Sequence, residues 1–105
     1  SYVGIGVEEP SVALNPKGDS VIVKTKGGFW TVYAVYEEIA DTIVEHVNRD
    51  FLDTVLINGF TIIKMDKNVF VKVDPNNTGG DRKINIKLMK AHNQDYLTIT
   101  QAKNE

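Results

Sequence analysis

The chain has 105 residues, of which 42% are hydrophobic and 25% are charged, and its formal net charge is −2. This length suits one domain of ordinary globular composition and is too short for two full domains. The composition excludes a largely disordered chain, and the small negative charge gives no overall attraction for nucleic acid or an anionic membrane. We therefore predict a single domain over residues 1–105.

Cysteine is absent from the sequence. Disulfides, thiolate nucleophiles and cysteine-ligated metal sites are excluded, and a reducing compartment is favoured, which predicts a cytoplasmic protein. Residues Ser1–Pro10 lack the basic and apolar regions of a signal peptide, although a leader removed before Ser1 stays an alternative. No apolar run reaches the length of a membrane span. The triplet Asn76-Asn77-Thr78 is a glycosylation sequon, which would matter only in a secretory protein.

The first third of the chain predicts an irregular lead-in followed by a hairpin. Glycine and proline interrupt residues 1–19, within which Val12–Leu14 is a candidate edge strand. Ser20–Lys26 alternates in the manner of a strand, and Phe29–Val35 is rich in aromatic and β-branched residues. Because Gly27-Gly28 between them tolerates the backbone of a tight turn, the sequence predicts a β-hairpin here.

A change of period in the next segment predicts a helix. Apolar residues recur at three- and four-residue spacing at Val35, Ile39, Ala40, Ile43, Val44, Val47 and Phe51. This is the stripe of an amphipathic helix. Between Glu37 and Asp50 there are five acidic residues and one arginine, a local charge of −4, so we expect an acidic solvent face on this helix.

Alternation with a period of two returns after Asp53 and predicts five further strands. We expect them at Thr54–Ile57, Phe60–Met65, Val69–Val73, Lys83–Lys90 and Tyr96–Gln101. Asn58-Gly59 is a strong hairpin signal, and residues 92–95 are the expected turn of the last hairpin. The polar segment Asp74–Arg82 is predicted to be a mobile loop, and residues 102–105 a frayed tail.

These elements predict an α+β fold with the order ββ-α-βββββ. In it, a single amphipathic helix packs on a mostly antiparallel, strongly curved sheet or small barrel. Seven basic residues against three aspartates between Phe60 and Lys90 give the C-terminal sheet a local charge of +4. The helix and this sheet are therefore expected to carry opposite charge.

No pattern of residues predicts catalysis or metal binding. His46 and Asp50 are one helical turn apart, which can present two metal ligands, but we favour a half-buried, hydrogen-bonded structural histidine. His92 has no partner near it in the sequence. The carboxylates fall on the expected solvent face of the helix, and Gly27-Gly28 and Gly79-Gly80 lack the spacing of a phosphate-binding loop. We therefore predict no catalytic, cofactor-binding or metal-ligating residue, no cofactor, and a chain that is not an enzyme.

The alternation also places aromatic and basic side chains on outward faces of the strands. The candidate binding surface consists of Trp30, Tyr33, Phe70, Lys72, Lys83, Lys87 and Tyr96. Phe29–Val35 and Phe60–Met65 are apolar on both sides, which indicates either central strands or contact with a partner.

The sequence therefore predicts a small protein-binding module, such as a bacterial or phage accessory factor. Its partner is expected to be another protein or a second copy, as a homodimer, and no membrane partner is expected. A nucleic-acid-binding small β-barrel that uses the lysine and aromatic face is the alternative. A small-molecule or enzymatic site between helix and sheet is a third hypothesis.

Overall fold

The computed structural model describes residues 4–105, which form nine β-strands and no helix. The strands are β1 (Ser11–Leu14), β2 (Asp19–Lys24), β3 (Thr31–Ile39), β4 (Thr42–Val47), β5 (Thr54–Ile57), β6 (Phe60–Met65), β7 (Asn68–Val73), β8 (Arg82–Lys90) and β9 (Asn93–Gln101). Accordingly, no helix in this part of the chain is long and apolar enough to cross a membrane.

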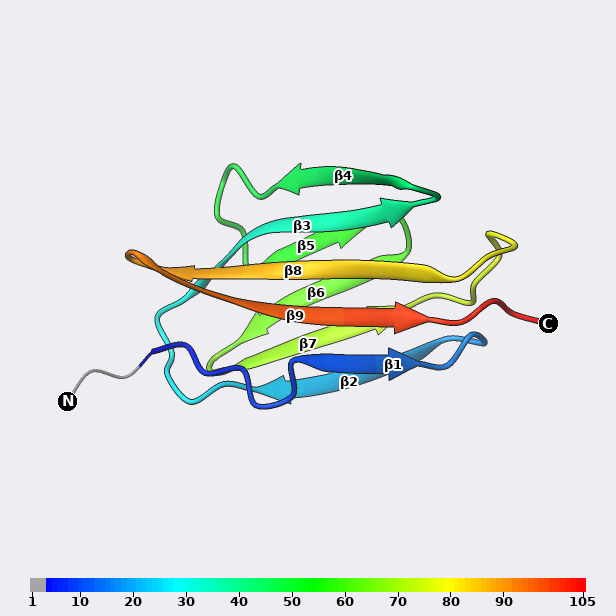
Figure 1. Ribbon diagram of the computed structural model, residues 1–105. Helices are drawn as coiled ribbons and strands as arrows, with labels where there is room; N and C mark the ends of the chain where they lie inside the picture. The colour runs from blue at the N-terminus through cyan, green and yellow to red at the C-terminus, as the bar shows by residue number, and fades with distance from the viewer. Residues whose placement is uncertain (1–3) are drawn as a thin grey trace.

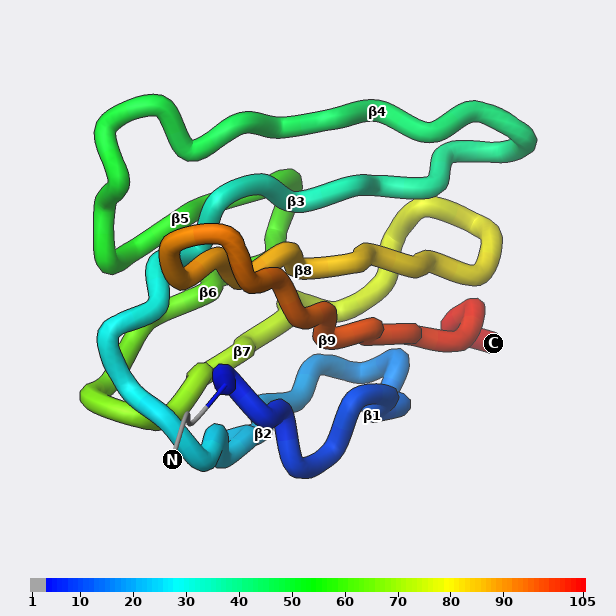
Figure 2. Tube along the Cα trace, turned by 60° about the vertical axis from the view of Figure 1, so that its left-hand side comes forward, coloured from blue at the N-terminus to red at the C-terminus, as the bar shows by residue number. Residues whose placement is uncertain are grey.

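The strands form two sheets that lie face to face. The five-stranded sheet has the order β1-β9-β8-β3-β4, and the four-stranded sheet has the order β2-β7-β6-β5. Figure 1 views the molecule with the five-stranded sheet in front, and Figure 2 shows the two layers from a different side. All neighbouring strands are antiparallel except β1 and β9, which are parallel. Part of this order matches an immunoglobulin-type sandwich: β2, β7 and β6 correspond to strands B, E and D, and β3, β8 and β9 correspond to strands C, F and G. Strand β5 lies outside that correspondence, because it pairs with β6 in the four-stranded sheet.

The hydrophobic core lies between the two sheets and takes alternate residues from each strand. Val69, Val71 and Val73 on β7 face inward, and Ile84 and Ile86 do the same on β8. Because successive side chains on a strand point to opposite faces, this alternation leaves the residues between them on the outer faces. The outer faces are therefore where a partner can be contacted.

The predicted helix is wrong, because Val35–Phe51 forms the end of β3, a two-residue turn, β4 and part of the following loop. In the turn, Ala40 has a φ of +53°, which a right-handed helix does not allow. The apparent helical stripe arises because the apolar residues are divided between two antiparallel strands. Six of the residues from 35 to 47 are β-branched, and such side chains favour strands. The α+β fold and the acidic helix face are corrected to an all-β fold.

The predicted hairpin across Gly27-Gly28 is also wrong, since β2 and β3 belong to different sheets. The chain crosses between the sheets over residues 25–30, and Trp30 enters the core at this point with none of its surface exposed. Its Nε1 donates a hydrogen bond to Thr25 Oγ1 (3.0 Å), and Thr25 Oγ1 donates to Lys67 O (2.6 Å). The curved single sheet or barrel is thus replaced by a sandwich.

The later strands agree with the sequence prediction. The β5–β6 hairpin turns at Asn58-Gly59, where both residues have positive φ (+44° and +86°). Strands β7 and β8 begin within one residue of the expected positions. Strand β9 starts earlier than expected, at Asn93, so the last hairpin turns at Ala91-His92.

The two ends of the chain are held by contacts with the sandwich. Residues 1–3 of the predicted lead-in lie outside the described residues, and the expected edge strand is confirmed as β1. Ile5 is buried against the core. At the other end, Asn76 Nδ2 in the loop before β8 donates to Ala102 O (3.0 Å), and Lys103 N donates to Asp81 Oδ1 (2.9 Å). The loop and the start of the tail, both expected to be mobile, are thus joined by hydrogen bonds.

Candidate binding face

Side chains on the outer face of the five-stranded sheet line up in rows across β9, β8, β3 and β4. One row consists of polar residues, namely Thr98, Asn85, Tyr36 and Glu45. The next row consists of Tyr96, Lys87, Ala34 and Val47. Tyr33 lies beside the second row. We define the tyrosine face as Tyr33, Tyr36, Asn85, Lys87, Tyr96 and Thr98.

A β-bulge in β3 brings Tyr33 to this face. The pairing of β3 with β8 shifts between Val32 and Ala34, so that Tyr33 is an additional residue opposite β8. Bulges re-aim side chains in this way. The Nζ atom of Lys87 lies 5.1 Å from the centroid of the Tyr33 ring, and Tyr96 is the Cα partner of Lys87 on β9. Lys87 therefore contacts the Tyr33 ring on one side and is paired with Tyr96 of β9 on the other.

Hydrogen bonds fix the polar row. Thr98 Oγ1 lies 2.6 Å from Asn85 Oδ1 and donates a hydrogen bond to it. Glu45 is the Cα partner of Tyr36 on β4, and its carboxylate raises the pKa of Tyr36 above its ordinary value, chiefly as an acceptor for the Tyr36 hydroxyl. Partial burial and the nearby charges raise that pKa further. The neighbouring carboxylate therefore favours the protonated form of the Tyr36 hydroxyl.

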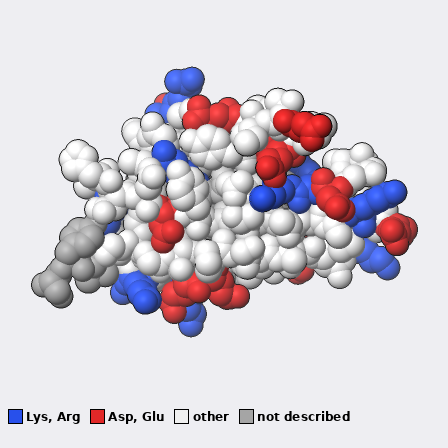
Figure 3. Space-filling model, viewed as in Figure 1, with Lys and Arg blue, Asp and Glu red and all other residues white. Residues whose placement is uncertain are grey.

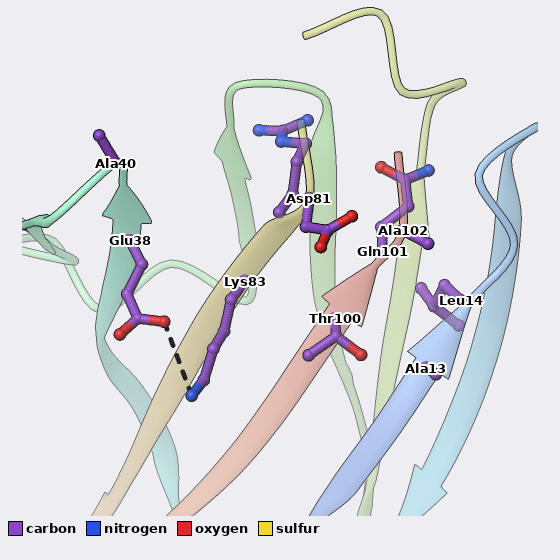
Figure 4. Close-up of a pocket in the computed structure, with 10 residues that line it drawn as sticks. Ala13, Leu14, Glu38, Ala40, Asp81, Lys83, Thr100, Gln101 and Ala102 are labelled. Atoms are coloured by element: carbon purple, nitrogen blue, oxygen red, sulfur yellow. Dashed lines mark ion pairs between the residues drawn. The ribbon is translucent and has the colours of Figure 1, made fainter. Parts of the chain in front are cut away.

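An open pocket of about 500 Å³ lies at the end of this face, where β3, β8, β9 and β1 finish or begin. Figure 4 shows the Glu38 and Lys83 side chains pointing toward each other at its rim, with Oε2 and Nζ 3.6 Å apart. Thr100 and Ala13 provide small side chains beside them. Because Lys83 and Glu38 are partly exposed (45% and 37%) and paired with each other, these two side chains offer little free charge to a ligand.

Charge is sparse in the middle of the five-stranded sheet. Figure 3, drawn from the same side as Figure 1, shows mostly uncharged atoms across the centre, with lysine, arginine, aspartate and glutamate mainly toward the ends and margins. Such a surface resembles the central part of a protein interface, where charged residues are depleted and tyrosine is enriched. The expected contrast between an acidic helix and a basic sheet does not occur.

The structure separates the residues of the predicted binding surface into three places. Tyr33, Lys87 and Tyr96 lie together on the outer face of the five-stranded sheet, and Lys83 lies on the same face four residues before Lys87, at the pocket. Trp30 belongs to the core and takes no part in a surface. Phe70 and Lys72 lie on the outer face of the four-stranded sheet, where Phe70 pairs with Ile22 and Ile63. Three of the seven predicted residues are therefore brought together, and a fourth lies on the same face.

The sequence prediction missed Tyr36, Asn85 and Thr98 as members of this face. Tyr36 was hidden by its assignment to the start of a helix. Asn85 and Thr98 alternate along their strands with apolar residues, but they are neither aromatic nor basic and so were not included in the predicted surface. Their position in one row with Tyr36 follows only from the pairing of β3 with β8 and of β8 with β9.

A buried carboxylate connects the two sheets near the β5–β6 turn. Glu37 on β3 points inward. Asn58 Nδ2 donates a hydrogen bond to Glu37 Oε1 (2.8 Å), and His46 Nε2 lies 3.0 Å from the same oxygen. Arg82 Nη2 donates hydrogen bonds to Glu37 Oε2 (3.2 Å) and to Asn58 O (2.8 Å). The Arg82 guanidinium also stacks on the Phe60 ring, 4.5 Å from its centroid. Burial raises the pKa of Glu37, but the hydrogen bonds from Asn58, His46 and Arg82 together outweigh it and hold the pKa below its ordinary value.

This cluster is an ion-pair network that already uses the functional groups of its members. Both carboxylate oxygens of Glu37 have partners, so the carboxylate is poorly placed to accept a proton from a substrate. His46 pairs with Glu37 across the β3–β4 hairpin, as a partly buried structural histidine does. Within residues 4–105 no group of three or more His, Asp or Glu side chains is arranged to hold a metal ion.

Comparison with known proteins gives a fold and no family. No family model matches the chain, and no curated protein matches it by sequence. Among solved structures, a protein from Bacteroides thetaiotaomicron determined by NMR aligns with 100% of this chain and 86% of its own, with a TM-score of 0.73 and 16% identity. Titin domain M7 aligns with 99% of this chain and 93% of its own, with a TM-score of 0.51 and 6% identity. At such low identity these similarities support the sandwich fold alone.

Proposed function

We propose that the chain is a non-enzymatic protein-binding domain whose partner rests on the tyrosine face. The observation that carries the proposal is the alignment of Tyr33, Tyr36 and Tyr96 around Lys87 on one nearly uncharged sheet surface. Tyrosine rings supply large contact areas with little loss of conformational entropy on binding, and their hydroxyls remain able to form hydrogen bonds. Since the strands beneath them are paired along their length in the sheet, the partner meets a preorganised surface.

The distribution of basic side chains favours a protein over a nucleic acid. Binding of single-stranded nucleic acid requires lysines and aromatic rings on one groove or face. Here Lys72 and Phe70 lie on the opposite sheet from Lys87, and Lys83 is paired with Glu38. Lys87 has no carboxylate paired with it among residues 4–105. A single such lysine between two tyrosines offers little phosphate neutralisation, which is the main source of affinity for nucleic acid.

Two features of the chain support the cytoplasm as the compartment that we propose. The sequence has no cysteine. In addition, the sequon asparagine Asn76 is buried, and its Nδ2 donates to Gly80 O (2.8 Å) and Ala102 O (3.0 Å), so it is not available to a glycosyltransferase in the folded protein. Cell fractionation with a tagged chain tests this assignment, and recovery from the secreted fraction would contradict it.

The proposal is tested by affinity capture from the native host with three baits. These are the wild-type chain, the double variant Tyr33→Ala/Tyr96→Ala, and Lys72→Ala as a control on the other sheet. We expect one protein partner to be retained by the wild type and Lys72→Ala and lost by the tyrosine variant. Retention of that partner by the tyrosine variant, or nuclease-sensitive capture of nucleic acid in its place, would contradict the proposal.

A further inference from the structure

The two sheets have four edge strands, and three of them are protected against pairing with another strand. Strand β1 is four residues long and lies between Pro10 and Pro16. Strand β2 is charged at both ends, with Asp19 and Lys24, and the chain before β1 covers its last residue through the hydrogen bond from Glu8 N to Lys24 O (3.0 Å). Strand β5 has only four residues. Short strands, prolines and covering segments are the usual means by which sheet edges avoid association.

Strand β4 is the fourth edge and has none of these protections. It has six residues without lysine or proline and pairs with β3 in an uninterrupted register. Figures 1 and 2 both show it running along the margin of the molecule, with no strand beyond it. Two of its outward side chains are apolar and exposed: Ile43 is 63% exposed and Val47 is 37% exposed.

The register determines which backbone groups of β4 are open. The pair Ile39–Thr42 closes a two-residue turn, so Thr42, Val44 and His46 direct their N–H and C=O groups toward β3. The bond from Asn48 N to Tyr33 O (3.0 Å) continues the same alternation. Ile43, Glu45 and Val47 therefore direct their N–H and C=O groups away from the sheet. No backbone hydrogen bond within residues 4–105 reaches these groups.

We propose that β4 binds an extended segment of a partner protein, which adds as a sixth strand beside β4. The segment would carry a basic residue opposite Glu45 and apolar residues two positions to either side, opposite Ile43 and Val47. Main-chain hydrogen bonds supply affinity in this mode, and alternate side chains supply specificity. The inference rests on the proposed function in that the partner is a protein, and the added strand would extend the tyrosine face past Tyr36.

Charge decides between this partner and a second copy of the chain. In the antiparallel self-pairing with the largest overlap, Ile43 lies opposite Val47 of the other copy, but the two Glu45 side chains lie opposite each other. Like charges directly opposite destabilise a strand pair. Shifting the register to centre on Val44 sets each Glu45 against Ile43 of the other copy. Because Glu45 forms no ion pair with any described residue, a basic residue on a different protein is the better match.

The side-chain part of the proposal is tested with two synthetic peptides. Each is a threonine-rich strand with valines at two alternate positions, and the central position between them is lysine in one peptide and glutamate in the other. Binding is followed by NMR titration of labelled wild-type chain, Glu45→Gln and Glu45→Lys. We expect the wild type to prefer the lysine peptide by about fivefold, Glu45→Gln to lose the preference and Glu45→Lys to reverse it. Equal binding of both peptides by all three chains, or no binding by the wild type, would overturn the proposal.

The backbone part is tested with Ile43→Pro, which removes an N–H that the sandwich does not use. Proline is tolerated on edge strands at such positions, so we expect the chain to fold. Its affinity for the lysine peptide should fall at least tenfold. Should that variant fail to fold, Ile43→Lys leaves the backbone intact and is expected to give the same loss by repelling the lysine peptide. Undiminished binding of the lysine peptide by the folded variant would overturn the proposal. It would also be overturned if light scattering showed that the wild-type chain is a dimer and that Glu45→Lys is a monomer.

The same peptides separate this inference from the proposed function. Tyr33→Ala/Tyr96→Ala should still bind the lysine peptide, because neither side chain belongs to the β4 edge. If the captured partner depends on the tyrosines while Ile43→Pro retains it undiminished, the edge proposal fails and the tyrosine face stands. If the partner depends on Ile43 but not on the tyrosines, the tyrosine face fails and the edge stands.

Discussion

The outer faces of the two sheets differ in kind although they belong to one sandwich. The four-stranded sheet exposes aliphatic side chains and one phenylalanine, with Phe70 between Ile22 and Ile63 and with Leu56 71% exposed at the edge. The five-stranded sheet exposes tyrosines joined to polar and basic neighbours over β3, β8 and β9, and exposed aliphatic side chains, Ile43 and Val47, on its edge strand β4. Scattered apolar residues are common on protein surfaces and need no partner. A row of tyrosines with oriented hydrogen-bonding neighbours is the more specific feature, and it lies on the five-stranded sheet.

The comparison of the two outer faces assumes that Trp30 lies between the sheets and belongs to neither face. Replacing it with alanine should lower the free energy of unfolding by about 3–5 kcal/mol, because a large cavity is left in the core. A surface tryptophan would cost well under half of that on replacement. Urea unfolding followed by circular dichroism measures this loss. A loss of unfolding free energy below about 1 kcal/mol would indicate that Trp30 lies on the surface.

The buried carboxylate that joins the sheets provides the next largest effect. Glu37→Gln should lower the free energy of unfolding by about 1–3 kcal/mol at neutral pH, since Arg82 and His46 lose an ionised partner. The pKa of Glu37 is lowered in the folded state. Its contribution to stability is therefore complete above the unfolded-state pKa of about 4.3 and is lost as the pH falls through the lower folded-state pKa.

Unfolding measured across acidic pH tests this assignment. The difference in stability between the wild type and Glu37→Gln should shrink as the pH falls below about 4. A constant difference across that range would show that Glu37 does not carry the charge of the cluster.

Removing the hydroxyl of Tyr36, on the tyrosine face, should have a smaller effect on the free energy of unfolding. Tyr36→Phe should cost about 0.5–1.5 kcal/mol, because the hydrogen bond with Glu45 is lost. Since the pKa of Tyr36 is raised in the folded state, its contribution is complete below the unfolded-state pKa of about 10 and is lost as the pH rises through the folded-state pKa. Ultraviolet titration of phenolate should lose its late component in Tyr36→Phe, and an unchanged titration curve would argue against the hydrogen bond.

The smallest effect compares one lysine from each face. Lys87→Ala should lower the free energy of unfolding by about 0.5–1 kcal/mol, because the contact of Nζ with the Tyr33 ring is lost. Lys72→Ala should change it by less, since the described residues include no aromatic ring beneath its Nζ. Paired urea midpoints measure the order of the two variants. A larger cost for Lys72→Ala would reverse the comparison.

The sequence predicted those strands whose signals are local. Asn58-Gly59 fixes the β5–β6 hairpin because both residues accept the positive φ that this turn requires. Alternation with a period of two also located β8 and β9, on which the alternate apolar residues such as Ile84 and Leu97 are buried. In the β3–β4 hairpin, a two-residue turn at Ala40-Asp41 carries neither glycine nor asparagine, so nothing local interrupted the apparent helical period.

The candidate face could be predicted only in part, for a different physical reason. Alternation along one strand tells which side chains point outward, but it does not tell which sheet the strand joins. Lys72 and Lys83 were therefore placed on one surface, although their strands β7 and β8 lie in different sheets. Trp30 was placed on the surface because its role depends on the crossing between sheets, which is set by contacts with Thr25 and, through it, Lys67.

The most direct test of the central claim is an NMR titration of the labelled chain with its captured partner. We expect the largest changes at the amides of the tyrosine face on β3, β8 and β9, with little change on β2 and β7, and a loss of binding in Tyr33→Ala/Tyr96→Ala. Changes concentrated around Phe70 and Lys72, with undiminished binding by the tyrosine variant, would contradict the account.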